Sequence, residues 1–227
     1  MKICHTLLVI SVLTALTACN QPNQAAEPAE PTPTKTADHA DHAHHHAHHT
    51  PSANEPAHVS EYMTAMTQMH NDMTTAMKHA HPDVAFVAGM IPHHQGAVAM
   101  AQIQLKYGKD EELRRLAQTI IDSQQAEIDM MQAWLKDNAS LTSNDSPHVQ
   151  AYEQLSGHDE MMTGMAEQDP DVAFAKGMIP HHQSAIEMAD IELKHGKDDK
   201  IKALATQIKN AQTPEIKQMQ DWLAKTK

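Results

Sequence analysis

The sequence predicts an all-α protein, a four-helix bundle built from two tandem repeats with extra short Met-rich helices. The segment from Gly89 to Gln95 returns from Gly177 to Gln183, a shift of 88 residues (177 − 89 = 88). Hydrophobic residues make up 41% of the chain and aromatic residues only 3%, so the core must be built from Met, Leu, Ile and Ala, which mostly favour helices. One unit of about 80 residues is marginal alone, so the two copies are expected to share a core.

Residues 1–18 are typical of an export signal, with an early positive charge and a short apolar run that ends before Cys19. The site resembles the lipobox of bacterial lipoproteins, which implies cleavage before Cys19 and lipid attachment to its thiol. An ordinary cleaved signal ending near Ala18 is the alternative. Both place the mature chain outside the cytoplasm. The lipoprotein interpretation places it on the periplasmic side of a bacterial membrane, and Asn20 favours the outer membrane.

Residues 19–57 predict a disordered tether, because they are rich in Pro, Ala, Thr and Glu and have almost nothing apolar to bury. A histidine tract lies inside it. Such tracts bind copper, zinc or nickel through imidazole with loose geometry, so we interpret it as an auxiliary capture site; a solvated spacer is the alternative. The tract's histidines are His39, His42, His44, His45, His46, His48 and His49.

The two repeats are expected to span residues 58–138 and 146–227, and each should open with a Met-rich helix. His70 and Met73 share one face of the first of these helices, and His158 and Met161 occupy the matching positions in the second. A Met stripe at this spacing is usually core, but the paired histidines keep a metal-ligand role open.

A long helix should follow in each repeat, from Pro82 to about Gly108 and from Pro170 to about Gly196. Proline suits the first turn, where its missing N–H costs little, and glycine suits a left-handed cap at the other end.

The Pro-His-His motif lies inside each long helix. Pro92 removes a helical hydrogen bond, so the helix should kink or restart there. Met90, His93 and Met100 step by helical spacing along one face with His94 beside them, so three potential metal ligands share that face. The same set in the second repeat is Met178, His181, His182 and Met188.

The last helix of each repeat carries an apolar stripe with a conspicuous polar residue. Glu127 and Met131 lie one turn apart in the first repeat, as do Glu215 and Met219 in the second. Two interpretations remain open: these side chains approach the histidines of the neighbouring helix, or the carboxylates only form structural or solvent contacts.

The motif Met-Ile-Pro-His-His-Gln, with its downstream Met-Ala, Glu-Ile and Trp-Leu, resembles the bacterial family called domain of unknown function 305 (DUF305). Both copies match, so the resemblance covers most of the chain after Val59. It implies a ferritin-like fold, a link to copper binding and resistance, and a ligand role for the Met and His residues of the motif. The histidine tract of the tether is not part of the family pattern.

Composition supports a metal-binding function. Sixteen Met and nineteen His supply soft and borderline donors suited to Cu(I) and Cu(II), and two Cys are too few to build a metal site, one of them lying in the signal. A net charge of −12 argues against a nucleic-acid partner. We therefore expect a non-enzymatic protein that sequesters or relays copper, with a copper-transfer protein as a candidate partner.

Two other functions remain as alternatives. A ferritin-like metal oxidase would need Glu-x-x-His motifs on two helices; Glu192 and His195 have this spacing, but their counterparts are Gln104 and Tyr107. A structural or interaction lipoprotein would have core methionines and incidental histidines.

Overall fold

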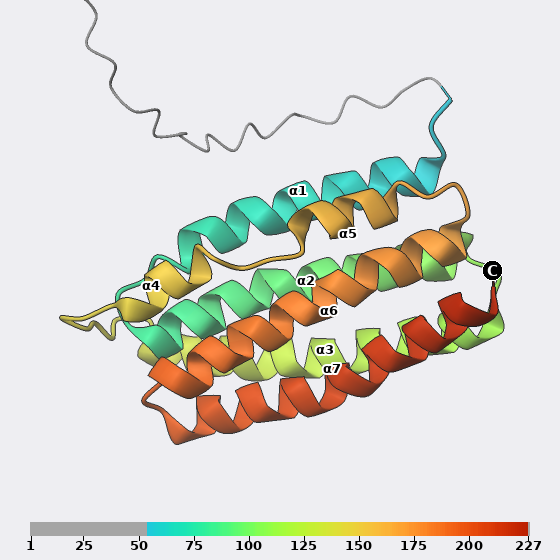
Figure 1. Ribbon diagram of the computed structural model, residues 1–227. Helices are drawn as coiled ribbons and strands as arrows, with labels where there is room; N and C mark the ends of the chain where they lie inside the picture. The colour runs from blue at the N-terminus through green and yellow to red at the C-terminus, as the bar shows by residue number, and fades with distance from the viewer. Residues whose placement is uncertain (1–53, 227) are drawn as a thin grey trace, which may run out of the picture. The chain divides into compact units, whose positions relative to one another are not determined.

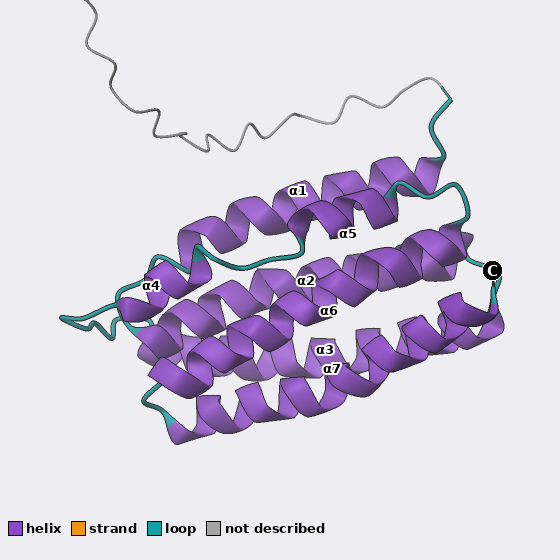
Figure 2. Ribbon diagram, viewed as in Figure 1, coloured by secondary structure: helices purple, strands orange, loops and turns teal. Residues whose placement is uncertain are grey.

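The computed structural model describes residues 54–226, and every regular element in that range is an α-helix (Figure 2). The predicted all-α class is confirmed. The helices are α1 (Ala57–Ala76), α2 (Pro82–Tyr107), α3 (Glu111–Asn138), α4 (Pro147–Tyr152), α5 (His158–Met165), α6 (Pro170–His195) and α7 (Asp199–Lys225).

Some predicted features lie outside the described residues: the signal at 1–18, the lipid attachment at Cys19, the histidine tract, and the tether up to residue 53. Within residues 54–226, no helix has the length and apolar character needed to cross a membrane.

The helices form three layers (Figure 1). The long helices α2 and α6 lie in the middle and pack against each other, α3 and α7 cover one side, and α1, α4 and α5 cover the other. The four long helices are those expected of the bundle. The middle layer is buried on both sides because α2 and α6 are apolar over most of their circumference, whereas α3 and α7 bury one stripe each.

Two equivalent aspartates connect the repeats in a reciprocal way. The Asp83 carboxylate of α2 accepts hydrogen bonds from the backbone N–H groups of Lys197 (2.9 Å) and Asp198 (2.9 Å), just before α7. Asp171 of α6 accepts from Lys109 (3.0 Å) and Asp110 (3.1 Å), just before α3. Reciprocal contacts between equivalent residues define a pseudo-twofold axis, with the start of each middle helix beside the end of the other.

The predicted left-handed caps at Gly108 and Gly196 are wrong. Both glycines are extended, with φ of −69° and −62°, because the chain passes directly into the next helix. Glycine is required there for space: a Cβ on either residue would collide with the side chain of Gln104 or Glu192 respectively. The expected restart at Pro92 is also absent, since α2 continues through it as one helix.

Both repeats begin with the same histidine–tyrosine contact, but its sequence offset differs from that of the rest of the repeat. His58 and Tyr62 of α1 form an edge-on ring contact with centroids 6.2 Å apart, and His148 and Tyr152 of α4 form the same contact at 6.1 Å. Their offset is 90 residues (148 − 58 = 90), so the uniform shift of 88 does not extend to this point.

Gly157 compensates for that difference. It takes a left-handed conformation (φ 88°) between α4 and α5, where the second repeat has two residues fewer than the first. This turn restores the shift of 88 at His158, the equivalent of His70. The second Met-rich segment is therefore broken at Gly157, where α4 and α5 are separate helices.

Candidate metal centre

The Pro-His-His motifs meet at the centre of the molecule. His93 of α2 and His181 of α6 stack with ring centroids 3.9 Å apart and a 48° tilt, and each is only 1% exposed. Burial, reinforced by neighbouring imidazoles, lowers the pKa of both rings well below the ordinary histidine value. The central pair is therefore neutral and keeps its nitrogen lone pairs at neutral pH.

The second histidine of each motif faces outward from this pair to a glutamate. His94 Nε2 lies 2.8 Å from Glu127 Oε2 on α3, and His182 Nε2 lies 2.7 Å from Glu215 Oε2 on α7. The glutamates thus approach the histidines, as the first of the two interpretations required. Since a carboxylate accepts, Nε2 of each ring donates to the glutamate, and Nδ1 is the ring nitrogen left for another partner.

Those Nδ1 atoms are buried donors for a metal. Within residues 54–226, neither His94 Nδ1 nor His182 Nδ1 has a hydrogen-bond partner. Metal-binding histidines commonly donate their other ring N–H to a carboxylate, which fixes the tautomer and the ring orientation. The His–Glu pairs have this form.

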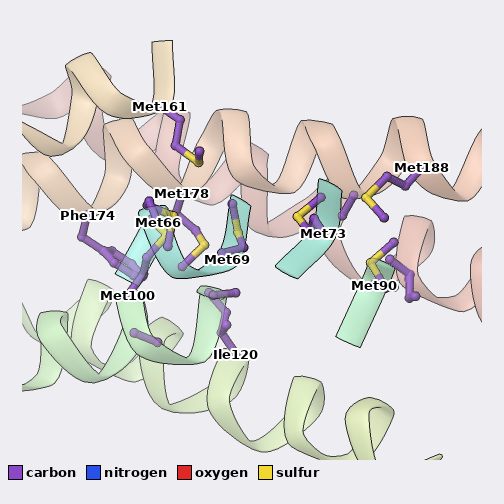
Figure 3. Packing of buried hydrophobic residues seen from close by; sticks show 14 of the residues in the cluster. Met66, Met69, Met73, Met90, Met100, Ile120, Met161, Phe174, Met178 and Met188 are labelled. Carbon is purple, nitrogen blue, oxygen red and sulfur yellow. The ribbon is translucent and has the colours of Figure 1, made fainter. Parts of the chain in front are cut away.

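The buried methionines gather in two groups (Figure 3). Both combine residues from both repeats, and the four methionines of one group are equivalent to those of the other by the shift of 88. The first methionine group consists of Met73, Met77, Met90 and Met188; the second consists of Met161, Met165, Met178 and Met100. Met66 and Met69 of α1 lie beside the second group and have no methionine counterpart in the second repeat.

Glycines let these side chains approach the middle helices. A Cβ on Gly89 of α2 would lie 2.9 Å from Met77 Cγ and 3.4 Å from Met188 Cε. A Cβ on the equivalent Gly177 of α6 would lie 2.6 Å from Met165 Cγ and 3.3 Å from Met100 Cε. Sequence reasoning did not include Met77 and Met165 among the ligands, although their place on the stripe could have indicated them.

The predicted grouping of Met90 with Met100 is wrong. Ten residues of helix separate them by about 15 Å, so they cannot share one site. Because α2 and α6 pack antiparallel, Met188 instead reaches Gly89, the residue before Met90, and Met100 reaches Gly177, the residue before Met178 (Figure 3).

The remaining predicted ligands within the described residues are His70, His158, Met131 and Met219. His70 and His158 contact each other across the outer layer, with ring centroids 5.3 Å apart. Met131 and Met219 are fully buried on α3 and α7, one turn after Glu127 and Glu215. In the described part of the chain, no three His, Cys, Asp or Glu side chains converge on a metal position, so thioethers must complete any interior site.

A family model described as domain of unknown function (DUF305) matches residues 12–135, 83–170 and 171–227. This chain belongs to the DUF305 family. The last two matches begin 88 residues apart (171 − 83 = 88), the same shift that relates the two repeats.

Solved structures of DUF305 relatives have the same fold. CopM in its Cu(I)-bound form is 31% identical, with 63% of this chain and 96% of that chain covered and a TM-score of 0.50. The apo form of CopM gives the same values. A DUF305 protein from Streptomyces coelicolor is also 31% identical, with 64% and 94% covered and a TM-score of 0.55. No curated protein matches significantly.

Proposed function

We propose that this DUF305 protein binds copper outside the cytoplasm and sequesters or relays it, without catalysing a reaction. The observation that carries the proposal is the pair of buried methionine groups, each assembled from both repeats beside buried neutral imidazoles. Thioethers prefer Cu(I), and imidazoles accept Cu(I) and Cu(II). Together they suit an oxidising compartment, where thiolates are unreliable ligands.

The donor atoms fit copper in their protonation state as well as their type. A metal ligand must present a lone pair, so a protonated imidazole does not bind. Burial keeps His93 and His181 neutral. The glutamate partners occupy Nε2 of His94 and His182, so Nδ1 is the ring nitrogen available to a metal.

The distance between the His93 and His181 rings decides whether the two histidines can bind one ion. Two imidazoles on one tetrahedral ion place their ring centroids about 5 Å apart, given metal–nitrogen bonds of about 2.0 Å. The 3.9 Å between His93 and His181 is too short for such a bridge. We therefore assign one copper position to each half, with the central pair as the packing contact between them.

In this assignment, each methionine group holds one ion with help from the outer histidine of its motif. Met90 and His94 lie one helical turn apart on the same face, as do Met178 and His182. The candidate ligands are thus Met90, Met188 and His94 in one half and Met178, Met100 and His182 in the other, with the remaining methionines of each group around them.

Similarity supports the proposal. CopM, which this chain covers over 96% of its length, has been solved in Cu(I)-bound form, and in an Ag-bound form at 95%. Both ions are soft and favour sulfur ligands.

The proposal extends to the segment before residue 54. A lipid at Cys19 would hold the protein on the periplasmic face of the outer membrane. The histidine tract would raise the local concentration of copper, and also of zinc or nickel. Deleting residues 39–49 should slow copper uptake and lower its stoichiometry, and unchanged uptake would remove the capture step from the proposal.

The direct test is an anaerobic Cu(I) titration against a chromophoric chelator, with residues 39–49 deleted throughout. Met90→Leu/Met188→Leu should lose one of two tight sites, because leucine preserves volume but supplies no ligand. The matched control is Met63→Leu/Met130→Leu, which removes two thioethers outside both groups. Equal tight binding by both variants would show that the methionines are ordinary core and would favour a structural lipoprotein.

A further inference from the structure

A second pair of equivalent histidines contacts each other at the surface. His70 lies on α1 in the first repeat and His158 begins α5 in the second, with ring centroids 5.3 Å apart and a 54° tilt. His158 is exposed and His70 half-buried. Side chains that contact their own equivalents lie on the pseudo-twofold axis, so this pair and the central pair, His93 and His181, share one axis.

We propose that His70 and His158 form a single metal site, shared by the two repeats, where this axis leaves the protein. The site would take a divalent transition-metal ion of the class that prefers imidazole, such as Zn(II) or Cu(II). The inference rests on the proposed function and adds a surface metal site to the interior methionine groups. Its test does not depend on Cu(I) binding.

The spacing of the rings fits this role. Two imidazoles on one tetrahedral ion have centroids about 5 Å apart. The surface pair at 5.3 Å matches that distance, whereas the central pair at 3.9 Å does not. The centroid distance of the surface pair is thus compatible with a shared ion, and that of the central pair is a packed contact.

The backbone supports the same pairing. The second repeat has lost two residues between Tyr152 and His158 relative to Tyr62 and His70. The left-handed turn at Gly157 nevertheless places His158 opposite His70. Asp159 and Glu160 follow His158 in the first turn of α5 and add negative charge beside the pair. No third His, Cys, Asp or Glu in residues 54–226 completes the set, so water or a thioether would fill the remaining positions.

The test uses the full chain with the seven tract histidines replaced by Asn, titrated with Zn(II) against a chromophoric chelator. We expect one Zn(II) per surface pair, and at least a tenfold loss of affinity in either His70→Asn or His158→Asn. The double variant should lose less affinity than the two single losses combined predict, because both residues bind one ion. His195→Asn is the matched control, since it removes a half-buried imidazole elsewhere and should leave affinity unchanged.

A second measurement covers any effect on folding. Zn(II) should raise the thermal midpoint of the parent and of His195→Asn, but not of either pair variant. Affinity within twofold of the parent in His158→Asn, or equal losses in His70→Asn, His158→Asn and the control His195→Asn, would overturn the site. Zn(II) binding should also survive Met90→Leu/Met188→Leu, so failure of the interior assignment and failure of the surface site are separately visible.

Discussion

Glu192 of α6 faces Asp83 of α2 as a second buried carboxyl group, at the position where the first repeat places an amide. In that repeat Gln104 Nε2 donates to Asp171 Oδ1 at 2.6 Å. Glu192 is 1% exposed, and burial, together with the Asp83 carboxylate, raises its pKa from 4.5 to about 10. At neutral pH it therefore stays protonated, which lets it act toward Asp83 as the amide acts toward Asp171.

Glu192→Gln should stabilise the protein at high pH. The folded pKa lies above the unfolded value, so the stability of the protonated form is complete below pH 4.5 and declines as pH rises toward about 10. The substitution should raise the free energy of unfolding at pH 8 by about 1–3 kcal/mol and change it little at pH 4. Urea denaturation at both pH values measures this. Gln104→Glu should have the opposite effect; if both substitutions were neutral, the carboxyl pair would not control stability.

Acid should destabilise the fold through the central histidines. His93 and His181 have pKa values well below the ordinary 6.5, so the unfolded chain binds protons that the folded chain refuses. As pH falls below about 6.5, each histidine should lower the free energy of unfolding by about 1.4 kcal/mol per pH unit until its folded pKa is reached.

The measurement for this effect is urea unfolding at half-unit steps from pH 7.5 to 5. His93→Gln/His181→Gln should flatten the slope relative to the parent even if its absolute stability is lower. An equal slope in both proteins would assign the acid sensitivity to other groups.

Adding a methyl group at Gly89 or Gly177 should disturb the methionine groups. Gly177→Ala places a Cβ 2.6 Å from Met165 Cγ and 3.3 Å from Met100 Cε, so those side chains must shift. We expect a loss of stability of about 1–3 kcal/mol and weaker Cu(I) binding in one half only. Thermal unfolding and Cu(I) titration test this, with Ser184→Ala on the same helix as the control. Wild-type Cu(I) binding in Gly177→Ala would show that the second methionine group does not bind copper.

The His–Glu pairs should tune copper affinity. Glu127→Gln keeps a hydrogen-bonding side chain but removes the carboxylate that fixes the His94 ring. Loss of such a partner typically reduces metal affinity by about 10–100-fold, and we expect this for one of the two sites. Glu112→Gln on the same helix is the control, because it contacts no histidine of the centre. If the two variants bound Cu(I) alike, His94 would not be a ligand.

The sequence alone determined the repeat, the all-helical class, the long helices and most of the donor residues. These follow from local rules: helical spacing fixes which of Met90, His93 and His94 share a face, and proline and glycine mark the helix ends. The glutamate partners were also within reach, since Glu127 interrupts an apolar stripe. One failure was also local. Gly108 was predicted to be a left-handed cap, but it is extended, and a side chain there would collide with the Gln104 side chain.

The tertiary structure decided which donors meet. Helical periodicity shows which residues share a face but not which are close together, so Met90 and Met100 share a face although they lie far apart along α2. Antiparallel packing of α2 on α6 brings Met188 to Gly89, the residue before Met90, and stacks His93 on His181, and a left-handed turn at Gly157 brings His158 to His70. A pattern repeated in one chain cannot specify contacts between the copies, because these depend on the orientation of the repeats. The pseudo-twofold axis fixes that orientation, and with it the composition of each candidate site.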